Sequence, residues 1–106
     1  MNSSINHKVF DHITRSPKKF SINNISFMSR ERDEFSLGFV IPKSLGSAVM
    51  RNRFKKRCRF SLLKLEQQNL LPLCGVVIKP KTININYNDI NESIRFWVDA
   101  FDGMGN

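Results

Sequence analysis

The sequence has little of several features that would assign it to a common class. It has two cysteines and two histidines in 106 residues, and no apolar run near the roughly 18 residues that a membrane-spanning helix needs. Two cysteines do not make the disulfide framework of a small secreted domain. The start, MNSSINHKVF, lacks the apolar core of a signal peptide. We therefore expect a soluble protein of the cytoplasm that has no membrane partner.

Groups that could carry catalysis are also scarce. His7 and His12 are five residues apart, a poor spacing for one helix face, and we expect ordinary surface histidines. Cys58 and Cys74 form no C-x-x-C pair, which favours small buried side chains over zinc ligands. The carboxylates are scattered, whereas a metal nuclease needs several that converge. We expect no catalytic residue and no metal site in the chain itself.

Positive charge, by contrast, is abundant and lies in one segment. The chain carries 17 Lys and Arg against 9 Asp and Glu, a formal net charge of +8. Eight of the basic residues lie in the window 43–64, which contains no Asp or Glu. Six of them fall within residues 51–59, where they repel one another and favour an external polyanion. A solvated basic helix face without a partner is the alternative interpretation.

Hydrophobic spacing predicts a single α+β domain over residues 1–106. A short helix is expected over 4–14, with Ser4 as its cap. Three strands are expected next, over residues 18–22, 24–30 and 35–41. The polar run 31–34 predicts a hairpin turn, and 35–41 is apolar enough for a central strand of the sheet.

The basic segment predicts a long helix. Its apolar side chains form one stripe at helical spacing. The stripe consists of Met50, Phe54, Cys58, Leu62 and Leu65. A strand over 74–79 and a last helix that begins at Asp89, with Glu92 as its capping-box partner, complete the order α-β-β-β-α-β-α. The apolar face of the last helix should consist of Ile90, Ile94, Trp97, Val98 and Phe101. The helix should end at Gly103, and residues 82–88 fit either an edge strand or a loop.

One ordered motif is more specific than the charge. Residues 43–59 read KSLGSAVMRNRFKKRCR. With this motif the chain resembles the protein subunit of bacterial ribonuclease P. The matching positions are Lys43, Gly46, Ala48, Val49, Arg51, Asn52, Arg53, the basic run 55–57 and Arg59. The strands FSLGFVIPK and CGVVIKP, and the pair Val9-Phe10, are also similar to the family, so that the resemblance covers about residues 8–101.

The resemblance implies an accessory subunit of a ribozyme. In this family the RNA subunit, with bound Mg²⁺, hydrolyses precursor tRNA at the end of its 5′ leader. The protein binds that RNA through its basic helix and holds the single-stranded leader in a central cleft. The implied fold is a ferredoxin-like two-layer sandwich with an unusual left-handed crossover, against the usual right-handed rule.

Two sets of binding residues are predicted. Arg forks onto phosphate oxygens, Lys supplies a point charge, and Asn can donate and accept hydrogen bonds. The expected RNA-binding set is Lys43, Arg51, Asn52, Arg53, Lys55, Lys56, Arg57 and Arg59. The resemblance implies a leader-binding set of Phe10, Phe27 and Phe39, with a place in the core as the alternative for Phe10 and Phe39.

Three positions depart from the family pattern. Asn6 stands where the family has an aromatic residue that stacks on the leader, which leaves the strength of leader binding open. Ser44 stands where the family has a second Lys, and Phe60 where an acidic residue is common.

Other functions fit parts of the sequence. A small basic ribosomal-type RNA-binding protein would explain the charge and the α+β pattern, but not the ordered motif. A stand-alone nuclease would need a catalytic constellation that the sequence lacks. A DNA-binding protein would need a partner helix beside the basic one, so no DNA is expected as a partner.

Overall fold

The fold is a mixed β-sheet with helices on both of its faces. The computed structural model describes residues 5–104 of the chain. In chain order the elements are α1 (His7–Arg15), β1 (Lys18–Ile22), β2 (Ile25–Glu31), β3 (Ser36–Phe39), a 3-10 turn η1 (Lys43–Leu45), α2 (Ala48–Gln67), β4 (Cys74–Pro80) and α3 (Tyr87–Met104). The predicted α+β class and the predicted order of helices and strands are confirmed. None of the helices described is long and apolar enough to cross a membrane.

The strands lie in the order β1-β2-β4-β3. β1 and β2 form a hairpin whose turn, Asn23-Asn24, has positive φ angles of 52° and 65°, a conformation that Asn tolerates better than most residues. β4 pairs antiparallel with β2 and parallel with β3. α2 therefore belongs to the crossover that connects two parallel neighbours. The left-handed sense implied for that crossover stays a prediction.

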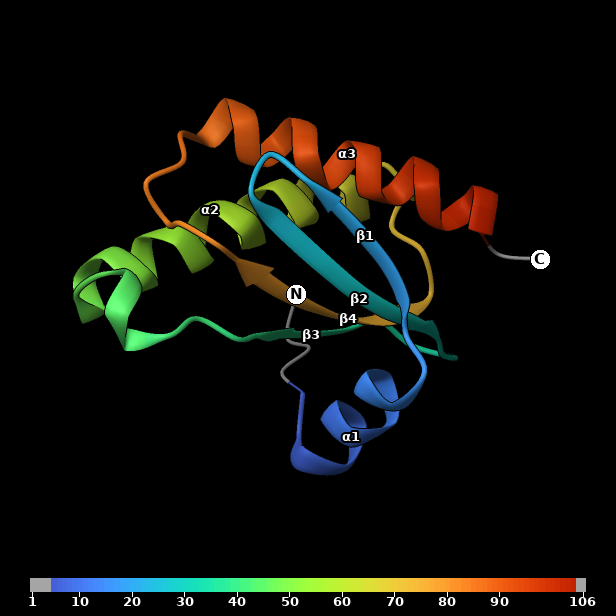
Figure 1. Ribbon diagram of the computed structural model, residues 1–106. Helices are drawn as coiled ribbons and strands as arrows, with labels where there is room; N and C mark the ends of the chain where they lie inside the picture. Colours follow the sequence, from blue (N-terminus) through green and yellow to red (C-terminus); the bar gives the residue numbers. More distant parts are fainter. Residues whose placement is uncertain (1–4, 105–106) are drawn as a thin grey trace.

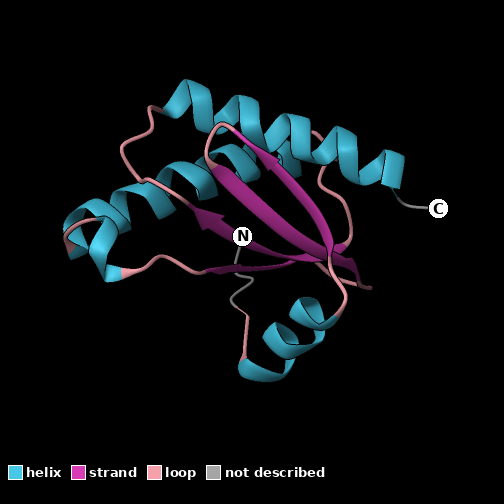
Figure 2. Cartoon of the chain, viewed as in Figure 1, coloured by secondary structure: helices cyan, strands magenta, loops and turns pink. Residues whose placement is uncertain are grey.

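Two predictions about β3 are wrong. The strand is four residues long and lies at the edge of the sheet, so the run 35–41 is not a central strand. Residues 31–34 do not form a hairpin turn, because β4 separates β2 from β3 (Figure 2). β4 takes the central place because it is buried at six of its seven positions and can be covered on both faces.

The main core lies between the sheet and the pair α2 and α3 (Figure 1). The predicted stripe of α2 is buried from Phe54 onward, and all five predicted positions of α3 are buried. Phe27 of β2 stacks on Trp97 of α3 with 5.4 Å between ring centroids. Met50, which was expected on the stripe, is 41% exposed because the first turn of α2 projects beyond the sheet.

Both cysteines are buried in this core, as predicted. Burial raises the pKa of the Cys58 thiol and that of the Cys74 thiol to about 12, although Arg59 and Lys18 respectively act in the opposite direction. A thiol with such a pKa stays protonated at neutral pH, and the thiolate is the reactive form. The two cysteines are therefore inert core residues.

α1 covers the opposite face of the sheet. Its N-cap is Asn6, whose Oδ1 accepts a hydrogen bond from the backbone N–H of Val9 at 3.0 Å. The predicted cap, Ser4, lies outside the described residues. Ile13 is fully buried against Gly75 of β4, where a larger residue would collide with it. Gly75 thus lets a short helix sit directly on the central strand.

The segment between β4 and α3 is a loop, so the alternative of an edge strand does not hold. Ile83 and Ile85 of this loop are buried in the core. The cap of α3 is Asn86, whose Oδ1 accepts from the N–H of Asp89 at 2.9 Å. The prediction that Asp89 caps the helix is wrong by three residues, and α3 continues past Gly103 to Met104.

Candidate nucleic-acid interface

The outward side of α2 is basic over most of the length of the helix. Ser47 starts the helix by accepting a hydrogen bond at its Oγ from the N–H of Met50 at 3.2 Å. The buried stripe faces the sheet, so the basic residues between its members must point outward or sideways. Four predicted RNA-binding residues of α2 are exposed and line one shallow hollow together with Val49. These four are Asn52, Arg53, Lys56 and Arg59.

Two predicted residues lie at the start of this surface. Lys43 is exposed on the turn η1, and Arg51 is half-buried with its Nε donating to the carbonyl of Ser47 at 3.4 Å. Gly46 joins η1 to α2, and a Cβ there would come within 2.8 Å of the Ile83 side chain. Close approach of the loop at Ile83 is therefore the reason for a glycine at this position of the motif.

Arg57 differs from the other basic residues of α2. It is half-buried, and its guanidinium donates to the carbonyl of Ile85 at 2.9 Å. This bond connects α2 to the loop before α3. A charged donor of this kind stabilises the fold by about 1.5–3 kcal/mol. The predicted RNA-binding role of Arg57 stays a prediction, but the residue also has a structural role.

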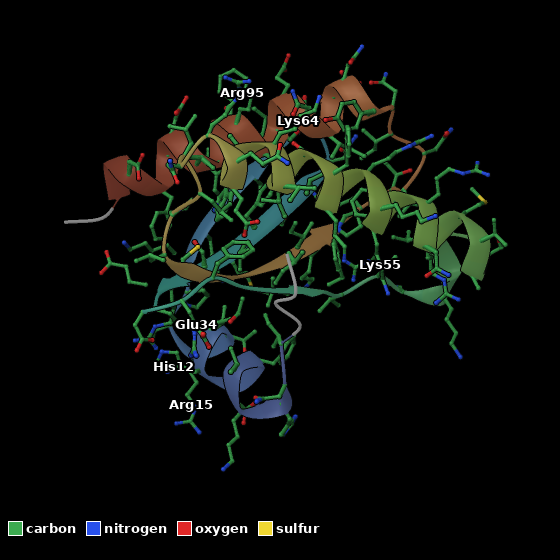
Figure 3. The ribbon with its side chains drawn as sticks, turned by 180° about the vertical axis from the view of Figure 1, so that it is seen from behind. His12, Arg15, Glu34, Lys55, Lys64 and Arg95 are labelled. Carbon is green, nitrogen blue, oxygen red and sulfur yellow. The ribbon has the colours of Figure 1, made fainter. Side chains whose placement is uncertain are left out.

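The other flank of α2 faces a groove. Lys55 Nζ lies 5.9 Å, and the Arg59 guanidinium carbon 5.4 Å, from the centroid of the Phe39 ring on the edge strand β3. Figure 3 shows Lys55 on the side of α2 nearest β3, and Lys64 on the side nearest α3. The groove continues across β3 to α1. It is lined by Ile5, Asn6, His7, Phe10, Leu37, Gly38, Phe39, Lys55 and Arg59.

The structure therefore brings together two of the three predicted leader-binding aromatics. Phe10 of α1 and Phe39 of β3 are both half-buried and line the same groove. Ile5 packs so closely on Gly38 that a Cβ there would lie 2.9 Å from its Cδ1. The absence of a side chain at Gly38 allows the segment before α1 to approach the edge strand.

Phe27 is the exception, and its assignment to the leader is wrong. It is 1% exposed and lies in the core on Trp97, with an angle of 7° between the rings. Ile25 and Phe27 alternate with less buried residues along β2, so both side chains lie on the buried face of the sheet. Sequence reasoning missed His7, which lines the groove, because only the packing of α1 against β3 brings it there.

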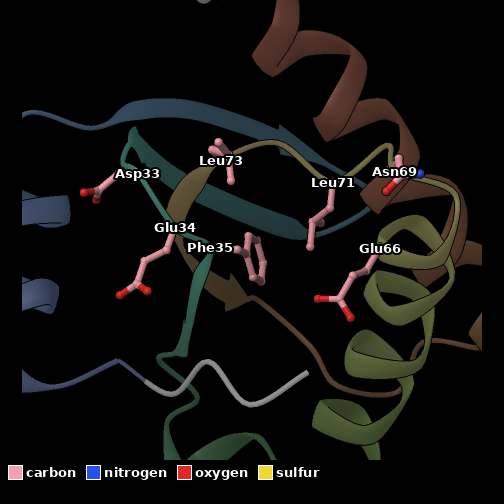
Figure 4. Close-up of a pocket in the computed structure, with 7 residues that line it drawn as sticks. All are labelled: Asp33, Glu34, Phe35, Glu66, Asn69, Leu71 and Leu73. Atoms are coloured by element: carbon pink, nitrogen blue, oxygen red, sulfur yellow. The ribbon is translucent and has the colours of Figure 1, made fainter.

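The opposite end of β3 is acidic. Figure 4 shows a hollow between the loop after β2 and the C-terminal end of α2. It is lined by Asp33, Glu34, Phe35, Glu66, Asn69, Leu71 and Leu73. Within residues 5–104, no three His, Cys, Asp or Glu side chains are grouped so that they could hold a metal ion. The two ends of β3 thus differ in charge, and a polyanion is attracted to the end at Phe39 and repelled from the end at Phe35.

The chain is similar in sequence to known proteins. A family model described as Ribonuclease P matches residues 5–101. The chain is 30% identical over 90 residues to a "Ribonuclease P protein component" of Oceanobacillus iheyensis, covering 80% of this chain and 74% of that protein. A protein of the same name from Mycoplasma mobile is 27% identical over 86 residues, covering 81% of this chain and 77% of that protein.

Solved structures show the same fold. The RNase P protein of Staphylococcus aureus superposes with a TM-score of 0.77 at 19% identity, covering 94% of this chain and 95% of that chain. The RNase P protein of Thermotoga maritima gives a TM-score of 0.73 at 18% identity, covering 86% of this chain and 89% of that chain. The sheet and the three helices described above are therefore those of this group of structures.

Proposed function

Because this chain belongs to the ribonuclease P protein family, we propose that the two flanks of α2 bind different RNAs of that enzyme. The exposed outer flank, with Arg53 and Lys56, binds the ribonuclease P RNA. The inner flank, with Lys55 and Arg59, binds the 5′ leader of precursor tRNA in the groove. The observation that carries this proposal is the meeting of Phe10, Phe39 and two cations in one groove beside the basic helix.

The groove has the two kinds of contact that a single strand of RNA needs. Aromatic rings offer a stacking surface for any base, and cations follow the phosphates. Phe10 and Phe39 supply the rings, and Lys55 and Arg59 supply the charge. The acidic hollow at the far end of β3 repels phosphates, so the leader is expected to leave the groove before it reaches Phe35.

We assign the hydrolysis to the RNA subunit. A metal-dependent nuclease needs metal ions placed on the attacking and leaving oxygens. The carboxylates of Asp33, Glu34 and Glu66 are the obvious candidates for such ions on this chain, but they do not form a metal site. The Mg²⁺ ions of the reaction are therefore proposed to be bound by the RNA. The protein contributes charge neutralisation and placement of the leader.

Binding of the ribonuclease P RNA is expected to depend strongly on salt. If α2 neutralises about five or six phosphates, the logarithm of the association constant should fall with the logarithm of the salt concentration at a slope of roughly −4 to −5. Filter binding or fluorescence anisotropy measures that slope over about 50 to 400 mM salt, with the concentration of Mg²⁺ held constant. A slope near zero would show that the basic face is not the RNA-binding surface.

Phe10→Ala is expected to weaken binding of precursor tRNA to the assembled enzyme. Loss of one stacked base costs about 1–3 kcal/mol, which is roughly a 5- to 150-fold increase in the dissociation constant. Mature tRNA lacks the leader, so its binding should barely change. Phe35→Ala is a matched control, because Phe35 is also a half-buried aromatic of the β3 region but lies in the acidic hollow. Equal losses for both tRNAs would show that Phe10 acts only in folding.

Asn6 gives a second variant at the same groove. It lines the groove and caps α1, so Asn6→Phe adds a ring and removes a cap. We expect a stronger preference for precursor over mature tRNA, together with a loss of stability of about 0.5–2 kcal/mol. The preference is the ratio of the two dissociation constants, and thermal unfolding measures the cost of the lost cap. An unchanged ratio would remove Asn6 from the leader path.

A further inference from the structure

Two aromatic rings and a lysine form a cluster at the C-terminal half of α2, on the flank away from the groove. Phe60 lies against Tyr87, the first residue of α3, with 5.6 Å between ring centroids and 57° between ring planes. Lys64 Nζ is 4.9 Å from the centroid of Phe60 and 5.5 Å from that of Tyr87. Despite these neighbours, Phe60 is 53% exposed. We call these three residues the Phe60 cluster.

The Phe60 cluster continues the outer basic surface of α2. Arg53, Lys56, Phe60 and Lys64 follow one another at spacings of 3, 4 and 4 residues, which places them in one strip along the helix. The buried stripe lies on the other side of the helix, so Phe60 is not needed to complete it. The half-exposed ring of Phe60 thus lies between the cations of this strip. Residues 43–64, which include the whole strip, contain no Asp or Glu.

We propose that the Phe60 cluster is a stacking site for an unpaired base of the ribonuclease P RNA. Tyr87 and Lys64 hold the Phe60 ring in place, and its open face accepts the base. Lys64 and Lys56 meet the phosphates on either side of that nucleotide. This inference rests on the proposed function, in which the same RNA lies along the outer flank of α2.

The chemistry favours a nucleotide over a protein partner. An apolar protein surface that covered Phe60 would also have to desolvate Lys56, Lys64 and Arg53, which is costly without matching carboxylates. A nucleotide presents a flat π-face and a phosphate together, and both a ring and a cation are available here. The leader is not the expected occupant, because the groove at Phe39 lies on the opposite flank of α2.

The test compares Phe60 variants in binding to the ribonuclease P RNA without tRNA. Phe60→Ala and Phe60→Leu should each raise the dissociation constant by roughly 5- to 150-fold, whereas Phe60→Trp should retain binding. Leu keeps the apolar contact with Tyr87 but has no ring, so it separates stacking from packing. Phe96→Ala is the matched control, because Phe96 is 46% exposed on α3 beside Glu92 and Asp99, and it should bind as the unchanged protein does.

A fluorescence measurement gives a direct signal of stacking. The protein has one Trp, and Trp97 is fully buried. The added indole of Phe60→Trp should be quenched by the ribonuclease P RNA, and that of Phe96→Trp should not. Wild-type affinity in Phe60→Leu would overturn the stacking site and leave the proposed function intact. Failure of the unchanged protein to bind this RNA would overturn both.

Discussion

Purified protein, freed of RNA, should leave precursor tRNA intact, whereas protein and ribonuclease P RNA together should remove the 5′ leader at moderate Mg²⁺. The reason lies in the chemical groups available. The two cysteine thiols are buried, and their pKa values of about 12 keep them protonated. Asp33, Glu34 and Glu66 share a hollow but form no metal site. The measurement is cleavage of end-labelled precursor tRNA by the protein, by the RNA and by both.

His7 provides the control for this experiment. It is exposed and lines the groove in which the leader is proposed to lie, so it is the one histidine placed to meet that substrate. The residues that line the groove with His7 include no Asp, Glu or second His that could complete an acid–base pair. His7→Ala in the assembled enzyme should therefore keep the rate of the cleavage step. Cleavage by RNA-free protein that disappears in His7→Ala would place catalysis on the protein and contradict our assignment.

The helices could be predicted from the sequence because their signals are local. The stripe that begins at Phe54 and the apolar face that ends at Phe101 repeat at helical spacing, and both are buried as predicted. The order of the strands in the sheet could not be predicted from local signals, because it depends on pairing between distant segments. The run 35–41 looked as apolar as the segment that became β4, yet only β4 is buried on both faces. The cap of α3 was misplaced by three residues because Asn86 and Asp89 are both of residue types that can cap a helix.

The same difference between local and long-range features applies to the candidate site. Exposure of Arg53 and Lys56 follows from the helical pattern alone. The groove does not, because α1, β3 and α2 contribute to it from three separate parts of the chain. The hydrogen bond from Arg57 to Ile85 and the contact between Phe60 and Tyr87 also join distant segments. The pattern of charges therefore predicts RNA binding by α2, but it does not show which of the basic residues of α2 also serve the fold.

Phe54→Ala is expected to cause a large loss of stability. Phe54 is 1% exposed, and its ring packs nearly perpendicular to that of Phe39, with 6.4 Å between centroids and 77° between ring planes. Removing a buried phenyl ring costs roughly 3–5 kcal/mol through lost burial and the cavity left behind. The total stability of a domain is about 5–15 kcal/mol. Urea unfolding followed by circular dichroism should therefore show a markedly lower midpoint for this variant, with RNA binding retained while it is folded.

Arg53→Ala, one residue earlier on the same helix, should do the reverse. Its side chain is exposed, so the stability should change by no more than about 0.5 kcal/mol. Binding of the ribonuclease P RNA should weaken, and the salt slope should become shallower by about 1 because one phosphate contact is lost. Arg53→Lys keeps the charge and should keep the slope. Arg57→Ala should show both effects, since Arg57 is predicted to bind RNA and also donates to the carbonyl of Ile85. Unfolding of Arg53→Ala with an unaffected Phe54→Ala would mean that the two faces of α2 are assigned the wrong way round.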